Sequence, residues 1–279
     1  MIDEAIRGLP VPALRPLVAW YSGYRQEGVA PAVHRGLPSP YLTLILTLDD
    51  PLVIDRHPDP AQAPGSYRTL VGGLHTVPAL LSHDGRQSGI QVALRPLGAR
   101  RLLGLPAGAL GGLDVNGTEV LGSHAVELHE CLRLLPSWAS RFQLLDDTLL
   151  RLCAGVTEPA APEGEVTEAW RLLLRGEHTV AEVAQTVGWS SRRLSARFGA
   201  ELGVAPKAAA KIARFDRARR RLQAAAGVIR LTDLAIECGY YDQAHLARDF
   251  RTLAGLPPSQ WLAAEGRFVQ AHADAPGEW

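Results

Sequence analysis

Residues 179–206, TVAEVAQTVGWSSRRLSARFGAELGVAP, and residues 231–258, LTDLAIECGYYDQAHLARDFRTLAGLPP, decide the fold of the second half of this chain. The two stretches carry one residue pattern about 50 positions apart, and such an internal repeat marks a duplicated structural unit. The seven matched pairs are Ala184 with Ala235, Gly188 with Gly239, Trp189 with Tyr240, Leu194 with Leu246, Phe198 with Phe250, Gly203 with Gly255 and Pro206 with Pro258.

Each copy of the repeat predicts a helix, a tight turn and a second helix. In the first copy, the apolar spacing predicts helices over 180–187 and 192–199, and Gly188 supplies the left-handed conformation that ends the first helix. In the second copy, 232–238 forms the first helix and Gly239 ends it. The residues expected to cap these helices are Thr179, either Ser190 or Ser191, and Asp242, and a basic helix over Pro206–Gln223 joins the two copies.

This arrangement is typical of a helix-turn-helix, whose second helix enters the major groove of DNA. Arginine forms bidentate contacts with guanine, glutamine with adenine, and either basic residue type holds phosphate. For the arginines the alternative is a solvated helix face, and for His245 it is a phosphate contact or packing beside Tyr241. We expect Arg248 and Arg251, further along their helix, to contact phosphate. The candidate DNA-binding residues are Ser191, Arg192, Arg193, Arg197, Asp242, Gln243, His245, Arg248 and Arg251.

Residues 166–268 resemble the DNA-binding domain of AraC/XylS-type transcription regulators. The stretch LTDLAIECGYYDQAHLARDFRTLAGLPPSQW keeps the Ala, Gly-aromatic, Asp-Gln, Arg-x-Phe-Arg and Gly-x-x-Pro pattern of that family. The resemblance implies seven helices, with two recognition helices per chain placed on successive major-groove segments roughly one turn, about 10 bp, apart. The first copy departs from the family at Ala196, where an arginine is usual, and Tyr241 replaces a small residue in the second copy.

Charge divides the 279-residue chain into two parts. Residues 1–165 hold 13 arginines against 17 acidic residues, whereas residues 171–251 hold 15 basic and 8 acidic residues, although the whole chain is neutral. The stretch AGVTEPAAPEGE has the composition of an exposed linker. We therefore predict an effector-sensing or dimerisation domain over 1–153, a linker over 154–165, the DNA-binding domain over 166–268 and a frayed tail over 269–279.

The first half predicts a small β-sandwich or barrel closed by two helices, so that the whole chain is of the α+β class. A strand is expected over 41–48, and Asp84-Gly85 predicts a hairpin with arms over 75–83 and 88–94. Helical apolar stripes cover 121–135 and 138–152, and Ser137 is placed to cap the second. These stripes either pack on the sheet or form a dimer interface.

The first half is also similar, less specifically, to sensor domains found in a subset of the same regulators. The segments that carry this similarity are Leu14-Arg15-Pro16-Leu17-Val18 before Trp20-Tyr21, Pro96-Leu97-Gly98-Ala99, and Leu102-Leu103-Gly104-Leu105-Pro106. Four residues are candidates to line an effector pocket, although for the three aromatic ones the favoured interpretation is packing in the core. These candidates are Trp20, Tyr41, Tyr67 and His75.

Other classes of function lack their sequence signals. No nucleophile elbow, phosphate-binding loop, dinucleotide fingerprint or zinc-protease motif is present, so we expect no enzyme and no cofactor. His124 and His129 are five residues apart and face different sides of one helix, so no metal is expected. The widely spaced Cys131, Cys153 and Cys238 predict reduced, buried thiols, and with no signal peptide or membrane span visible we expect a cytoplasmic protein.

The sequence therefore predicts a transcription regulator that binds promoter DNA and responds to an effector. Its expected partners are double-stranded promoter DNA, a small-molecule effector, RNA polymerase and a second copy of the chain. The alternative is a DNA-binding architectural or recruitment protein whose first domain only contacts partner proteins. A ligand-sized cavity of about 300 Å³ or more in the first domain would favour the sensor, and a packed interior would favour the alternative.

Overall fold

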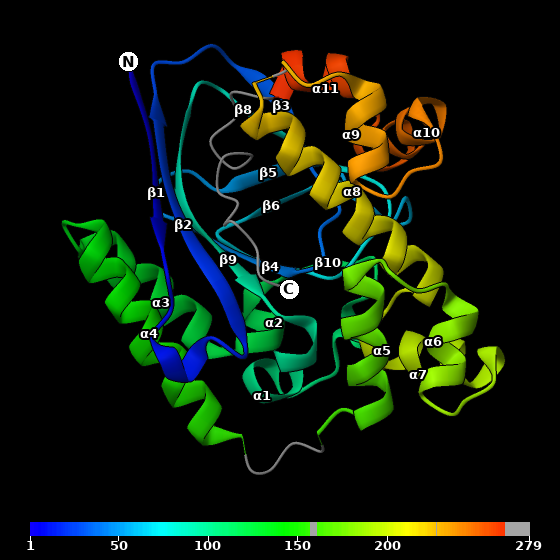
Figure 1. Cartoon of the computed structure of the whole chain (residues 1–279). Coiled ribbons are helices and arrows are strands. Elements are labelled where there is room, and N and C mark those ends of the chain that lie inside the picture. Colours follow the sequence, from blue (N-terminus) through cyan, green and yellow to red (C-terminus); the bar gives the residue numbers. More distant parts are fainter. Residues whose placement is uncertain (157–160, 227, 266–279) are drawn as a thin grey trace.

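The computed structural model describes residues 1–156, 161–226 and 228–265 (Figure 1). The first half of the chain combines two antiparallel β-sheets with helices, and the second half is built from helices alone over its described residues. This architecture confirms the predicted α+β class.

The strands of the first half form a six-stranded sheet, ordered β1-β2-β9-β4-β7-β10, and a four-stranded sheet, ordered β3-β8-β5-β6, within the described residues. All pairs are antiparallel, as expected for a sandwich. The strands are β1 Ile2–Gly8, β2 Val18–Glu27, β3 Ala32–Gly36, β4 Leu42–Thr47, β5 Leu52–Arg56, β6 Gly65–Tyr67, β7 Thr69–Gly72, β8 Ala79–His83, β9 Arg86–Leu94 and β10 Asp114–Asn116.

Strand β4 explains why this half has three layers. Successive side chains of a strand point to opposite faces of its sheet. Leu44 and Leu46 therefore join the large apolar core on one face, whereas Ile45 points to the other face and packs with Ile54 and Leu81 between the two sheets. The predicted strand over 41–48 is thus confirmed, and it is buried on both faces.

The predicted hairpin at Asp84-Gly85 is wrong, although both of its arms are strands. Strand β8 pairs with β3 and β5, and β9 pairs with β2 and β4, so the two strands belong to different sheets. Gly85 turns the chain with a φ of +105°. Both edges of β9 are already paired, with β2 and β4, so β8 cannot pair with it. The turn therefore connects the two sheets.

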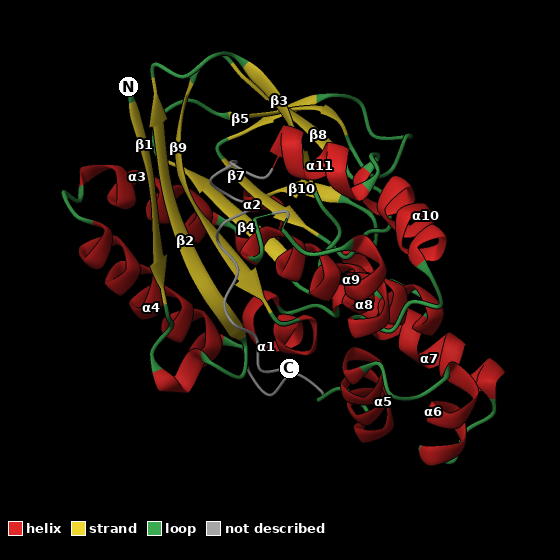
Figure 2. Ribbon diagram, turned by 45° about the horizontal axis from the view of Figure 1, so that its top comes forward, coloured by secondary structure: helices red, strands yellow, loops and turns green. Residues whose placement is uncertain are grey.

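Helices cover the outer face of the six-stranded sheet, as Figure 2 shows for α3 and α4. The stripe over 121–135 is divided between α2 and α3, because Gly122 at φ +59° interrupts the helix. Ser137 caps α4 as predicted, its hydroxyl accepting from the Ser140 amide. The helices of this half are α1 Ala99–Leu103, α2 Gly117–Leu121, α3 Ser123–Leu134 and α4 Trp138–Gly155, with short 3-10 helices at Pro12–Leu14, Pro96–Gly98 and Ala107–Leu110.

The second half contains seven helices in its described residues, the number that the family resemblance implies. Helix α8, which corresponds to the predicted 206–223 helix, lies between the two repeat units and packs against α5 on one side and α10 on the other. The helices are α5 Gly164–Arg175, α6 Val180–Thr186, α7 Ser191–Leu202, α8 Pro206–Ala224, α9 Leu231–Glu237, α10 Gln243–Ala254 and α11 Pro258–Glu265.

The two halves touch through closely packed backbone. A Cβ added to Gly203, at the end of α7, would lie 2.6 Å from the Cα atom of Gly111. One added to Gly108 would lie 2.1 Å from the carbonyl oxygen of Ala200. Glycine is required here both for its left-handed conformation, with φ +78° at Gly203, and for this close approach.

The predicted linker over 154–165 includes the end of α4 and the start of α5, and its central residues 157–160 lie outside the described residues. The predicted tail over 269–279 also lies outside them. The domain boundaries therefore stay predictions. One expectation about the cysteines is wrong: Cys153 and Cys238 are buried, but Cys131 is exposed because it lies on the solvent side of α3.

Candidate nucleic-acid interface and effector pocket

The first repeat unit is held in shape by its caps. Thr179 and Glu182 form a reciprocal capping box at the start of α6, and Ser190 caps α7 by accepting from the Arg193 amide at 3.2 Å. Between the helices, Gly188 has a φ of +70°. The sequence predicted the Thr179 cap and the glycine turn, and the structure decides between Ser190 and Ser191 in favour of Ser190.

Helix α7 presents its candidate DNA-binding residues on its exposed side. Leu194 and Phe198 are fully buried, so the opposite face of the helix is exposed to solvent. The guanidinium of Arg193 lies 4.8 Å from the centre of the Trp189 ring, and Arg197 forms an ion pair with Glu163. The exposed candidates on this helix are Ser191, Arg192, Arg193 and Arg197.

The second repeat unit has the same turn but different caps. Helix α9 begins after Arg230 without a side-chain cap, and Gly239 turns the chain with a φ of +78°. The carboxylate of Asp242 accepts from the His245 amide at 2.6 Å and caps α10. Asp242 therefore acts through the start of α10, where it orients the helix.

A cluster of charged and aromatic side chains lies between α10 and α8. The buried Asp249 carboxylate receives Arg214 Nη2 at 3.1 Å and Lys211 Nζ at 3.3 Å, both from α8. The Arg214 guanidinium also lies 4.7 Å from the centre of the Tyr240 ring. Burial raises the pKa of the Tyr240 hydroxyl, and the nearby Asp249 carboxylate raises it further. These contacts attach α10 to α8.

His245 takes part in this cluster. Its ring packs edge-on against Tyr240 at 5.1 Å between centroids, and its Nε2 atom lies 3.4 Å from Arg214 Nη2. The packing partner is therefore Tyr240 and not Tyr241, whose side chain is 91% exposed. The sequence did not reveal this cluster, because Arg214 lies 31 residues from His245 and 35 residues from Asp249 along the chain. The exposed candidates on α10 are Gln243, Arg248 and Arg251.

Helix α7 is also tied to the first half of the chain. Arg100 of α1 donates to both carboxylate oxygens of Glu201, through Nε at 2.9 and 3.1 Å and through Nη2 at 2.8 Å. Glu201 is buried, and its hydrogen bonds raise the pKa of the Arg100 guanidinium above its ordinary value. This bidentate pair lies on the back of the helix that carries Arg192 and Arg193.

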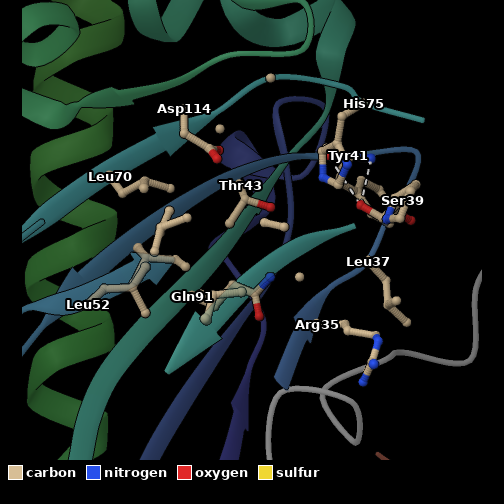
Figure 3. A pocket seen from close by; sticks show the side chains of 18 of the residues that line it. Arg35, Leu37, Ser39, Tyr41, Thr43, Leu52, Leu70, His75, Gln91 and Asp114 are labelled. Carbon is tan, nitrogen blue, oxygen red and sulfur yellow. Dashed lines mark hydrogen bonds between the residues drawn. The ribbon is translucent and has the colours of Figure 1, made fainter. Parts of the chain in front are cut away.

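A cavity of about 120 Å³ lies between the two sheets and is bordered on one side by the second half (Figure 3). Three of the four predicted pocket residues line it: Trp20, Tyr41 and His75. Figure 3 shows Gln91 and Asp114 among the polar side chains there, with Leu52 and Leu70 among the apolar ones.

Tyr67 does not line this cavity. Its hydroxyl lies 3.1 Å from Nε2 of His57, whose Nδ1 atom is 2.8 Å from the Asp114 carboxylate. Strand β6 ends at Tyr67, and the ring packs with the small core between the sheets, so packing is its role. His57, which the sequence did not single out, holds the carboxylate of Asp114 in position at the cavity wall.

One side of the cavity is closed by buried residues of the second half. Arg219, Trp261 and Glu265 line it from α8 and α11. Arg35 of β3 donates to Glu265 through Nη1 at 2.7 Å and through its backbone amide at 3.3 Å. Burial raises the pKa of the Glu265 carboxyl, and the hydrogen bonds from Arg35 offset this only in part. The cavity is therefore lined by α8 and α11 of the second half as well as by the β-sandwich.

Within residues 1–156, 161–226 and 228–265, no group of three or more His, Cys, Asp or Glu side chains is arranged to hold a metal ion. Within the same ranges, every helix is too short or too polar to span a membrane.

Together, the fold and the two exposed basic helices define a protein with a β-sandwich half and a double helix-turn-helix half. Residues 183–264 match the family described as "Helix-turn-helix domain", and residues 7–116 match a family described as "Domain of unknown function (DUF6597)". No protein of curated function matches the sequence. Residues 183–264 therefore form a helix-turn-helix domain of the AraC type.

Solved structures of ToxT from Vibrio cholerae share the fold of the whole chain. One, at 11% sequence identity and a TM-score of 0.53, matches over 88% of this chain and 97% of ToxT. Another, wild-type ToxT with an unsaturated fatty acid bound, has 9% identity and a TM-score of 0.52 over 88% of this chain and 94% of ToxT. At this level of identity, the likeness shows that the two proteins have the same two-domain fold.

Proposed function

We propose that this protein is a DNA-binding transcription regulator whose affinity for promoter DNA changes when a small molecule occupies the cavity between its halves. The observation that carries the proposal is the composition of that cavity. Most of its walls come from the β-sandwich, and one side comes from buried residues of α8 and α11 in the DNA-binding half. One ligand would thus contact both domains and favour one arrangement of them, which is a shift of population between states.

The proposed DNA contacts follow from exposure and chemistry. Arg192 and Arg193 on α7, and Gln243 on α10, have the side chains that read guanine and adenine in the major groove. Arg197, Arg248 and Arg251 suit phosphate. His245 packs against Tyr240 and Asp242 caps α10, so we assign both residues positioning roles.

The proposed effector is a small molecule with an acidic group and an apolar body. Arg35 and Arg219 line one side of the cavity, and Leu52, Ile54 and Leu70 form apolar parts of its wall. ToxT, which shares this fold, has been solved with an unsaturated fatty acid bound, and this supports an amphipathic acid here. Because ligand pockets usually measure about 300 Å³ or more, a cavity of about 120 Å³ fits a short molecule, and a longer one requires α11 to move outward.

The small cavity also supports a second candidate. A protein that recruits a partner such as RNA polymerase needs no ligand, and a nearly packed interior suits that role. Under this alternative the protein would bind DNA with an affinity that no small acid alters. We propose a homodimer in both cases. Sedimentation of the purified chain at several concentrations would test this by measuring the mass of the particle.

The first experiment is salt-dependent binding of the purified full chain to the DNA upstream of its own gene, with a scrambled duplex as control. The proposal predicts a preference for the upstream DNA and a steep dependence on salt. Arg251→Ala should weaken binding to both duplexes and reduce the salt slope by about one. Failure to bind any duplex at low salt would overturn the regulator function.

The effector is tested by repeating the binding with octanoic acid and with an unsaturated fatty acid. We expect at least one of them to change the DNA affinity several-fold. Ala79→Leu, which fills part of the cavity, should abolish the change while leaving DNA binding without the acid intact. Unchanged DNA affinity with both acids would favour the recruitment protein.

A further inference from the structure

A second hollow lies along α3, outside the cavity between the sheets. It has a volume of about 380 Å³ and shares no lining residue with that cavity. We name it the α3 groove. Its walls come from the β6–β7 region and from α2 and α3. The lining residues are Pro51, Ser66, Arg68, Thr69, Asn116, Thr118, Ala125, Val126, His129, Glu130 and Arg133. The volume falls within the range of pockets that bind small molecules.

Two arginines stand at the rim of the α3 groove. Arg68 and Arg133 are exposed, and no carboxylate of the described residues lies within ion-pair distance of either. The Arg133 Nε atom donates to the carbonyl of Leu48 at 3.1 Å, and this anchors the guanidinium at the groove. Glu130 is the single acidic residue among those lining the groove, so the lining carries a net positive charge.

His129 forms part of the groove floor. It is only 5% exposed, and its Nε2 atom has no hydrogen-bond partner among the described residues. Buried polar atoms are nearly always hydrogen-bonded, and leaving one unpaired is costly. Burial lowers the pKa of His129, and the charges of Arg133 and Arg68 lower it further, whereas Glu130 acts in the opposite direction. The His129 imidazole is thus neutral and lies near two arginine charges, and its Nε2 atom has no hydrogen-bond partner among the described residues.

We propose that the α3 groove binds the oxyanion group, phosphate or carboxylate, of a second small-molecule ligand. The anion would lie between the Arg68 and Arg133 guanidinium groups, whose planar arrangement of donors suits such oxygens, and would accept a hydrogen bond from His129 Nε2. The hydroxyl and amide groups of Ser66, Thr69, Asn116 and Thr118 offer further hydrogen bonds to the ligand, and Val126 and Pro51 offer apolar contact. This site does not depend on the proposed effector cavity.

The experiment titrates the full chain with inorganic phosphate and, separately, with acetate, at constant ionic strength set by sodium chloride. The imidazole resonances of His129 are followed by NMR, and His129→Gln assigns them. We expect phosphate, acetate or both to shift these resonances in a saturable way, while the exposed His178 ring stays unchanged. Saturation by phosphate alone identifies a phosphate ester as the ligand class, and saturation by acetate alone identifies a carboxylate.

Variants connect the signal to the groove. Arg68→Gln removes one exposed charge without disturbing the core, and it should weaken the anion about tenfold or more, the usual effect of losing a charged hydrogen bond. Arg56→Gln, an exposed arginine of β5 that does not line the groove, is the matched control and should bind as the parent does. Arg133→Lys keeps the charge and should give an intermediate affinity.

The proposal is overturned if neither anion shifts the His129 resonances up to tens of millimolar. It is also overturned if Arg68→Gln and Arg56→Gln change the affinity equally, because binding would then follow the net charge of the protein. Loss of the folded NMR spectrum in Arg68→Gln would be judged against Arg68→Lys, which should keep both the fold and most of the affinity.

Discussion

The two helix-turn-helix units carry the same sequence pattern but are supported differently. In the first unit, Arg193 of the exposed helix α7 lies over Trp189 of the same unit, and the back of α7 is attached to the β-sandwich half by Arg100 and Glu201. In the second unit, α10 is attached to α8 through Asp249, and its own His245 belongs to that attachment. The repeated pattern therefore gives both units the same helix-turn-helix shape, whereas the contacts that hold α7 and α10 in place depend on the neighbouring parts of the fold.

This difference bears on how a signal from the first half reaches DNA. The first unit touches α1 directly, whereas the second meets the first half through Arg35 and Glu265 at the wall of the cavity. Burial raises the pKa of the Glu265 carboxyl and so disfavours the charged form that pairs with Arg35, whereas Glu201 accepts three hydrogen bonds from the Arg100 guanidinium. We therefore expect the contact at α11 to open more readily than the contact at α7.

The largest expected effect comes from breaking the anchor of the second unit. Asp249→Asn would leave Lys211 and Arg214 without their shared buried carboxylate, and we expect the free energy of unfolding to fall by about 2–3 kcal/mol, less than for a wholly buried pair because both cations are partly exposed. Urea unfolding measures it. Asp233→Asn, on the exposed side of α9, is the control, and an equal loss in both variants would show that the cluster is not an anchor.

DNA binding tests whether the two units read bases alike. Arg193→Ala and Gln243→Ala should each cost roughly 1–3 kcal/mol on the specific site and much less on scrambled DNA. The ratio of the two affinities, measured by fluorescence anisotropy, gives the loss of specificity at each unit. Equal losses on both duplexes would assign these side chains to the phosphate backbone instead.

The anchor of the first unit should give a smaller effect on stability. Glu201→Gln keeps the shape of the side chain and weakens the charged hydrogen bonds from Arg100, which are partly exposed to solvent, so we expect a loss of about 1–2 kcal/mol. Hydrogen exchange should become faster in α7 and remain unchanged in α10. A variant with faster exchange in both helices would show that the units are held together and not separately.

The smallest expected effect concerns the caps. Thr179→Ala removes the capping box of α6 and should cost about 1 kcal/mol, whereas Arg230→Ser adds a cap to α9 and should stabilise the protein by a few tenths of a kcal/mol. Thermal unfolding should show opposite shifts in the midpoint. Shifts of the same sign would mean that the start of α9 is already satisfied by another contact.

Much of the local structure could be predicted because neighbouring residues determine it. Thr179, Asp242, Gly188 and Gly239 act within a few positions of themselves, so their roles follow from spacing and backbone preference. The helical stripes likewise depend only on a period of about 3.6 residues. The exception is Gly122. The apolar spacing predicts one continuous helix there, but Gly122 divides it into α2 and α3.

The candidate sites were predicted less completely. Trp20, Tyr41 and His75 do meet at one cavity, but Tyr67 turns instead toward His57, and Arg35, Arg219 and Glu265 enter the cavity from segments that the sequence gave no reason to connect. The Asp84-Gly85 turn fails as a hairpin for a similar reason. A turn sets the direction of the chain locally, whereas the partner of each strand depends on which other strands compete for its edges.

The sequence by itself determined the duplicated helix-turn-helix, its caps and turns, and the class of molecule that these helices suit. Only the tertiary structure decided that His245 packs within the second unit, that Arg100 and Glu201 join the two halves, and that α8 and α11 line the cavity. The physical reason is range. Caps and helical periods follow from interactions within one or two turns, whereas an ion pair or a cavity wall needs residues that folding alone brings together from distant positions.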